Sequence, residues 1–280
     1  MVSLALQSHP QVHIQFKEPN FFSGWGTRET FAGPHRHPAL ERVDRFCGTR
    51  EQYEALFSGA GDARAVGEAS VSSLPAEGAA ARIHELVPRV KLIALLRQPV
   101  DRAFSHWAMN RRYGIEPEED FRAALLDEPA RARQRWHPFH RYALISRYAD
   151  QLPEYQARFP AEQLRVYLHE DWSGSPERVW SELMTFLELD APYRPTFSAR
   201  PNEGVVLHGA WTAALAAARP WLTPRIPPRW RRAIRRRLDP IASYKPRIDP
   251  DLRQSLTHAL FRDDILRLQD QIRRDLTAWL

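Results

Sequence analysis

Cysteine is almost absent from this chain of 280 residues, because Cys47 is the only one. A single thiol excludes an intramolecular disulfide framework and any zinc site that uses several cysteines. Lysine is nearly as rare, since the 40 basic residues include only Lys17, Lys91 and Lys245. No apolar run approaches the roughly 20 residues of a membrane helix, and the first residues lack the charged-then-apolar pattern of a secretory signal. The sequence therefore predicts a soluble protein without a membrane span, which we place in the cytoplasm.

A phosphate-binding loop of the form Gly-x-x-x-x-Gly-Lys-Ser/Thr is also missing, and no pair of carboxylates suited to magnesium stands out. Both absences argue against a kinase or a nucleotide hydrolase. The chain is nevertheless basic, with a formal net charge of +6 and an isoelectric point near 9.7. A positive field suits a polyanionic cofactor, an anionic polysaccharide or nucleic acid, so charge alone does not choose among these partners.

Short apolar runs alternate with amphipathic stretches along the chain. The runs Leu92–Leu96 and Leu164–Leu168 predict buried parallel strands, whereas 148–159 and 176–187 have helical spacing. A closing helix is predicted over 249–280. Strands that alternate with helices indicate an α/β fold in which a central, mostly parallel sheet is flanked by helices. Because no linker is evident, we expect one domain over the whole chain.

The strand predicted at Leu92–Leu96 runs straight into an arginine and then a helix. Pro99 suits the first helical position, and Asp101 lies in the first turn, where the helix dipole favours negative charge. At the carboxyl end of a parallel strand, Arg97 offers a planar fork of donors to a phosphate, and Ser105 on the helix can add a hydroxyl. The alternative is that Arg97 only pairs with a carboxylate.

The spacing of Arg97, Pro99, Arg102 and Ser105 resembles the 3′-phosphate-binding motif of sulfotransferases that use 3′-phosphoadenosine 5′-phosphosulfate (PAPS). Further segments match the carbohydrate and heparan-sulfate-like branch of that family, in its bacterial form, in the same order: His9–Val12, Lys17–Phe22, Gly67–Ser70, Tyr148–Leu152, Phe186–Leu189 and Arg274–Leu280. The resemblance implies a single sulfotransferase-like domain over residues 1–280, with the sulfotransferase fold that is related to P-loop NTPases. It also implies that Arg97 and Ser105 bind the 3′-phosphate of PAPS.

The same resemblance implies a reaction and its residues. A sulfuryl group would pass from PAPS to a hydroxyl of a carbohydrate or similar acceptor, and no metal is expected. Glu18 would be the base, Lys17 would assist near the sulfate, and Glu68 and Ser70 would line the acceptor cleft. Asn20 stands where the family often has histidine. From the residues alone, Glu18 is better explained as a solvated loop carboxylate, and Glu68 could equally cap a helix or form a salt bridge.

One family feature is missing from the 280 residues. The loop Lys-x-Gly-Thr-Thr or Lys-x-Gly-Thr-Ser, which holds the 5′-phosphosulfate in relatives, occurs nowhere. Residues 1–10 resemble the helix that normally follows this loop, so we expect the fold without its first strand and loop. An N-terminally truncated, catalytically silent relative is therefore an alternative to an active enzyme.

A second alternative comes from the arginine-rich segment 229–237, in which Trp230 precedes five arginines. Such a strip suits a polyanion or nucleic acid, and equally a solvated helix face. Nucleic acid is the less favoured partner. His106, next to Ser105, is expected to be a packed or surface histidine and not the base.

Overall fold

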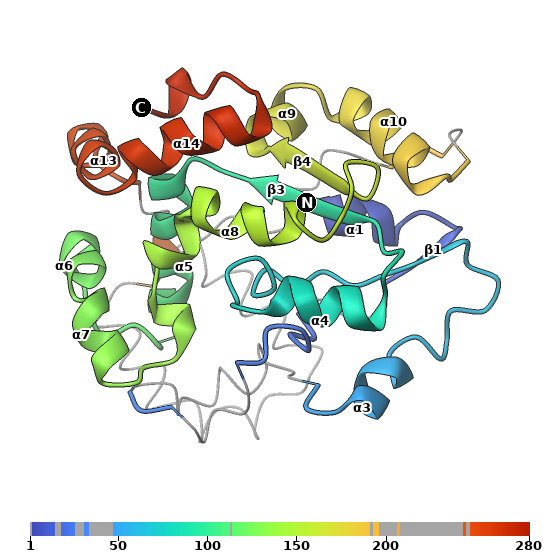
Figure 1. The fold of residues 1–280 in the computed structure, drawn as a ribbon. Helices are drawn as coiled ribbons and strands as arrows, with labels where there is room; N and C mark the ends of the chain where they lie inside the picture. Colours follow the sequence, from blue (N-terminus) through green and yellow to red (C-terminus); the bar gives the residue numbers. More distant parts are fainter. Residues whose placement is uncertain are drawn as a thin grey trace.

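The computed structural model describes most of the chain. The described residues are 2–14, 18–25, 31–33, 47–112, 114–190, 193–195, 206–207, 243–244 and 247–280. Figure 1 shows helices packed around short strands, with α9 and α10 on the β4 side of the β3–β4 pair. Two predicted features, Lys17 and the arginine-rich segment 229–237, lie outside the described residues.

The strands pair two by two. They are β1 (Val12–His13), β2 (Ala65–Val66), β3 (Leu92–Leu96), β4 (Leu164–Leu168), β5 (Val206–Leu207) and β6 (Ser243–Tyr244). The β1–β2 and β3–β4 pairs are parallel, and β5 pairs with β6 in the antiparallel sense. Parallel strands among helices were expected, but one continuous central sheet is not what the described residues form. The two-residue strands β1 and β2 bond only to each other, so no described strand pairs with the second edge of β3.

Helices make up most of the described chain. The α-helices are α1 (Val2–Gln7), α3 (Arg50–Ala55), α4 (Ala79–Leu86), α5 (Pro99–Arg112), α6 (Phe121–Leu126), α7 (Glu128–Arg133), α8 (Tyr148–Gln156), α9 (His169–Gly174), α10 (Pro176–Leu187), α13 (Pro250–Leu256) and α14 (Arg262–Ile272). Short 3₁₀ turns are η3 (Pro138–His140), η4 (Leu144–Ser146) and η7 (Thr277–Trp279), and η6 (Thr257–Phe261) is a π-helical turn.

Both faces of β3 pack against helices, as its continuous apolar run predicts. Ala94 and Leu96 belong to one core cluster with residues of α5 and α14, whereas Ile93 and Leu95 point to the cluster built on α1 and α10. This alternation follows from the two-residue period of a strand. Only Leu96 is fully buried, and the other four residues of β3 are half-buried, consistent with the missing strand partner on its second edge.

The chain departs from prediction at its carboxyl-terminal region. The single helix expected over 249–280 is divided into α13, the π-helical turn η6, α14 and η7. Arg273 has a φ of 51°, in the left-handed region, and its backbone N–H bonds back to the carbonyls of Gln269 and Asp270. That conformation ends α14, so residues 276–280 turn back onto the core, where Leu276 and Trp279 are buried.

A buried ion pair holds together the helices that follow α5. The Arg131 guanidinium donates to both carboxylate oxygens of Glu116, at 2.6 and 3.0 Å, and the Tyr142 hydroxyl donates to the same carboxylate at 2.6 Å. Burial alone would raise the pKa of Glu116, but hydrogen bonds from His140, Arg131 and Tyr142 lower it to about 2. The Tyr142 carbonyl in turn accepts from Arg102 of α5 at 2.6 Å. The network therefore fixes α5 to the η3–η4 region.

Replacing Arg131 with methionine leaves the Glu116 charge buried without its main partner. We expect a loss of about 3–5 kcal/mol in the free energy of unfolding, measured by chemical denaturation. The matched control is Arg50→Met, which removes the exposed pair with Glu54 and is expected to change stability by less than about 1 kcal/mol. Equal losses in the two variants would contradict this account of the network.

Candidate functional site

Reactive side chains follow the carboxyl ends of the parallel strands. Arg97 comes directly after β3 and His169 directly after β4, and the register pairs Leu96 with Leu168. The next residues along the two strands, Arg97 and His169, are therefore neighbours. In open parallel sheets, ligands bind at this edge. Glu68 likewise stands two residues beyond the end of β2.

His169 is a residue that the sequence analysis did not single out. Burial lowers its pKa, and the positive charge of Arg97 lowers it further, against the opposing charges of Glu170 and Asp101. A neutral imidazole therefore stands beside the guanidinium. The signal was present in the sequence, since His169 follows the predicted strand Leu164–Leu168 as Arg97 follows Leu92–Leu96.

The other two motif residues with polar side chains, Arg102 and Ser105, lie on helix α5 in different surroundings. Arg102 does not join Arg97, because its guanidinium is held by the Ser146 hydroxyl and the Tyr142 carbonyl, both at 2.6 Å. Ser105 is exposed, roughly 9 Å along the helix axis from Pro99. Within the described part of the chain, no hydrogen bond joins Ser105 to Arg97.

His106 is packed, as the sequence analysis expected. Its ring stands edge-on to the rings of Phe139 and Tyr142. Burial lowers the pKa of His106 well below its usual value, and the charge of Arg102 adds to this effect. A ring enclosed in this way is a poor candidate for the base.

A second cluster brings together the predicted residues Glu18, Glu68 and Ser70. The loop that starts at Glu18 lies on the loop after β2: the Glu18 backbone N–H donates to the Ala69 carbonyl at 2.8 Å, and Val71 N–H donates to the Glu18 carboxylate at 3.0 Å. The Ser70 hydroxyl donates to the Glu68 carboxylate at 2.7 Å. Two carboxylates therefore hold one short turn from opposite sides.

Asn20 makes three hydrogen bonds within this cluster. Its side-chain amide donates to the Glu18 carbonyl at 2.7 Å, its side-chain oxygen accepts from the Ser72 hydroxyl, and its backbone N–H donates to Ser70 at 3.0 Å. Glu18 and Asn20 both adopt left-handed backbone conformations, with φ of 62° and 54°. Asparagine tolerates this region, whereas glutamate is strained there by on the order of 1 kcal/mol. The buried Asn20 thus holds Glu18 in a conformation that it would otherwise avoid.

The Glu68 carboxyl is set apart by its environment. Burial raises the pKa of Glu68 to about 7, the charge of Glu18 contributes in the same direction, and the hydrogen bond from Ser70 opposes the shift. A carboxyl that titrates near neutral pH can exchange a proton with its surroundings. It stands next to the loop that presents Glu18.

Helix α8 spans the two clusters. Tyr148 lies close enough to Arg97 for the backbone and the charge of Arg97 to lower the pKa of its hydroxyl, and the Tyr155 hydroxyl donates to the Ser73 carbonyl at 2.6 Å. The two tyrosines are seven residues apart and so share one face of the helix, separated by roughly 10 Å along its axis. Arg97 therefore lies near the start of α8, and the segment that carries the Glu18–Glu68 cluster lies near its end.

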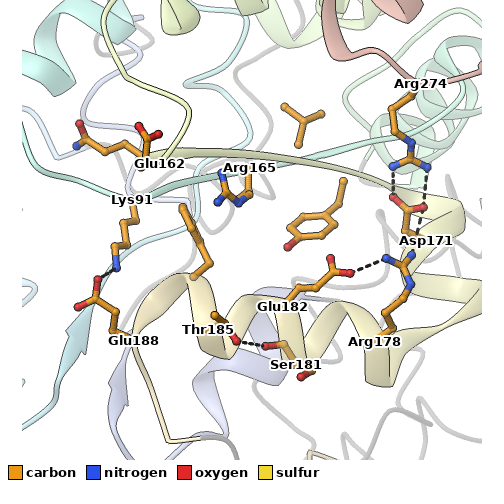
Figure 2. A pocket seen from close by; sticks show the side chains of 14 residues that line it. Lys91, Glu162, Arg165, Asp171, Arg178, Ser181, Glu182, Thr185, Glu188 and Arg274 are labelled. Carbon is orange, nitrogen blue, oxygen red and sulfur yellow. Dashed lines mark hydrogen bonds and ion pairs between the residues drawn. The ribbon is translucent and has the colours of Figure 1, made fainter.

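A large cavity lies elsewhere. It has a volume of about 760 Å³ and is lined by residues of β4 and α10 together with Arg274. Figure 2 shows three of its ion pairs, which join Arg274 to Asp171, Arg178 to Glu182 and Lys91 to Glu188. None of the predicted site residues lines it, so it carries no functional assignment.

The residues that the structure describes contain no cluster of three histidine, cysteine or acidic side chains that could hold a metal ion. Among the same residues, no helix is long and apolar enough to cross a membrane.

Comparison with known proteins gives concordant findings. A model of the sulfotransferase domain matches residues 11–200. A sulfotransferase crystal structure from Alicyclobacillus acidocaldarius is similar with a TM-score of 0.75 and 30% sequence identity, over 99% of this chain and 92% of that chain. The bifunctional heparan sulfate N-deacetylase/N-sulfotransferase of Drosophila melanogaster is 28% identical over 131 residues, which are 46% of this chain and 12% of the fly protein. The chain thus matches only a small part of the length of this curated relative.

The raised pKa of Glu68 predicts a pH dependence of stability. Its proton is bound more tightly in the folded state, so its contribution to stability is complete below about pH 4.5 and is lost as pH rises through about 7. The Glu68→Gln variant has no titrating group at this position, so its stability does not fall for this reason as pH rises. Between pH 5 and pH 8, the variant should therefore gain on the order of 1–3 kcal/mol relative to the unchanged protein in urea unfolding. Parallel stability curves for the two proteins would show that the Glu68 pKa is not raised.

Proposed function

Because the chain belongs to the sulfotransferase domain family, we propose that it transfers a sulfuryl group from PAPS to a hydroxyl of a carbohydrate or similar acceptor. The observation that carries this proposal is the arrangement of Arg97 and His169 at neighbouring strand ends, with the Glu18–Glu68 cluster at the far end of the same face of α8. Arg97 and His169 can bind phosphate, and the Glu18–Glu68 cluster can accept a proton.

At the nucleotide end, Arg97 binds the 3′-phosphate. A guanidinium presents two parallel N–H groups to a phosphate, which makes it a better partner than a point charge. His169, neutral beside Arg97, can donate one ring N–H to the same anion. Ser105 is exposed on α5, where a bound nucleotide can reach its hydroxyl.

At the acceptor end, the reaction needs a base. The acceptor oxygen attacks sulfur in line, a new S–O bond forms, and the bond to the bisphosphate oxygen breaks with its electron pair. Adenosine 3′,5′-bisphosphate leaves, and the hydroxyl proton must go to a nearby group. Glu18, oriented by Val71 N–H, takes that proton in this proposal, while Glu68 and Ser70 contact the acceptor. Lys17 assists near the sulfate. Transfer from this donor needs no metal, and the proposal includes none.

The acceptor class has separate support. The fly relative is named for heparan sulfate, which favours a carbohydrate acceptor, and the hydroxyl is the atom that the wider resemblance implies. The single cysteine permits the cytoplasmic location that we propose.

Arg97→Ala tests the nucleotide end. The loss of a charged hydrogen-bonding partner is expected to weaken binding of adenosine 3′,5′-bisphosphate by about 10- to 100-fold in titration calorimetry. Arg112→Ala, which removes an exposed arginine from the far end of the same helix, is the matched control and should leave the affinity unchanged. An Arg97→Ala protein that binds as tightly as the control would refute the phosphate assignment.

Glu18→Gln tests the acceptor end. The variant keeps the shape of the side chain but cannot take a proton, so turnover with PAPS should fall by about 10²- to 10⁴-fold. Its affinity for adenosine 3′,5′-bisphosphate should stay within about twofold of the original, since Glu18 lies at the other end of the site. Glu77→Gln, an exposed carboxylate replacement, is the control for turnover. Normal turnover by Glu18→Gln would mean that another group is the base.

A further inference from the structure

Gln98, between Arg97 and the start of α5, is almost fully buried, with 1% of its surface exposed. Its side-chain oxygen accepts from the Asp101 backbone N–H at 2.8 Å and so caps the helix. Its side-chain nitrogen donates to the Thr257 hydroxyl at 2.8 Å and to the Trp279 carbonyl at 3.1 Å. Gln98 directly follows Arg97, and its side chain therefore connects this position to two segments that lie about 160 and 180 positions further along the chain.

Both of those partners are themselves fixed. Thr257 is fully buried in the π-helical turn, and its hydroxyl donates to the Arg253 carbonyl at 2.8 Å. Trp279 is buried, and Leu276 N–H donates to the Gln269 side chain at 2.9 Å. The segment 276–280 is thus anchored to α14 independently of Gln98.

The same segment reaches Arg97 by a second route. The Trp279 ring packs against the ring of Tyr148, with centroids 6.5 Å apart. Tyr148 in turn lies close enough to Arg97 for the backbone and the charge of Arg97 to lower its pKa. Burial raises the pKa of Tyr148 to about 12, against the lowering effects of Arg102 and of the Arg97 backbone. Tyr148 is therefore neutral at physiological pH.

We propose that Gln98, Tyr148 and the segment 276–280 form a clamp that positions Arg97 for the 3′-phosphate of the nucleotide. The clamp acts through the Arg97 backbone, so its members are positioning residues. A long arginine side chain delivers its two donors to a phosphate only when its own backbone is fixed to within a fraction of an ångström. This inference rests on the proposed function.

The clamp makes a prediction about the 3′-phosphate alone. The quantity to measure is the ratio of the dissociation constants of adenosine 5′-monophosphate and adenosine 3′,5′-bisphosphate, by titration calorimetry. Gln98→Glu keeps the helix cap but loses both donated bonds, and Tyr148→Phe loses only the hydroxyl. Each should lower the ratio about three- to tenfold, while affinity for the monophosphate changes by less than twofold. A merely structural role would weaken both ligands alike.

A double variant tests whether the effect passes through Arg97. In an Arg97→Ala background, Gln98→Glu should produce no further change in the ratio, because the phosphate contact is already gone. The matched control is Arg262→Gln, which removes an exposed ion pair of α14 with Asp263 and should leave the ratio unchanged.

The outcomes separate the clamp from the proposed function. One outcome is that Arg97→Ala brings the ratio of the two dissociation constants to about one while Gln98→Glu and Tyr148→Phe leave it unaltered. In that case the clamp is wrong and the phosphate site stands. If Arg97→Ala also leaves the ratio unchanged, the phosphate site and the clamp both fall.

A measurement on the unchanged protein applies even if Gln98→Glu does not fold. Because coupling is reciprocal, binding of the bisphosphate should slow hydrogen exchange in residues 276–280 more than binding of the monophosphate at equal occupancy. Equal protection by the two ligands would overturn the clamp.

Discussion

The site depends on the parallel register of β3 and β4. Five consecutive residue pairs, from Leu92 with Leu164 to Leu96 with Leu168, place Arg97 and His169 at the same edge. The period of two then sends alternate side chains of β3 into different core clusters. A shift of one residue would move each set into the cluster that the other set fits and would carry Arg97 away from its place beside His169. The position of the guanidinium is thus set by packing more than by any contact of its own.

The two ends of the site are held in different ways. At the proposed nucleotide end, the buried Gln98 uses both atoms of its side-chain amide in hydrogen bonds and so fixes the backbone next to Arg97. At the proposed acceptor end, Asn20 and Val71 donate hydrogen bonds to Glu18, and the Glu18 backbone N–H donates to the Ala69 carbonyl. These bonds hold Glu18 in a strained left-handed conformation. Strain that the surrounding structure maintains is typical of functional positions. Asn20 stands where relatives often have histidine. It positions Glu18 through hydrogen bonds, and its own side chain does not titrate.

Local patterns predicted β3, β4 and α10 with the bounds that the structure has, and they placed Pro99 at the first position of α5. Apolar runs and proline act locally, so one sequence suffices to find them. The grouping of Glu18 with Glu68 and Ser70 came from the family resemblance, and the structure does bring these residues together. The break at Arg273, the pairing of strands in twos and the role of Gln98 were missed, because each depends on contacts between distant segments.

The central claim is that the edge formed by Arg97 and His169 receives the nucleotide. The most direct measurement is nitrogen-15 nuclear magnetic resonance of the Arg97 side chain and the His169 ring during titration with adenosine 3′,5′-bisphosphate. The account predicts that both signals shift together with one saturation curve, and that bound phosphate raises the His169 pKa. Shifts confined to Arg165, Arg178 and Arg274 around the cavity beside β4, with Arg97 and His169 unmoved, would contradict it.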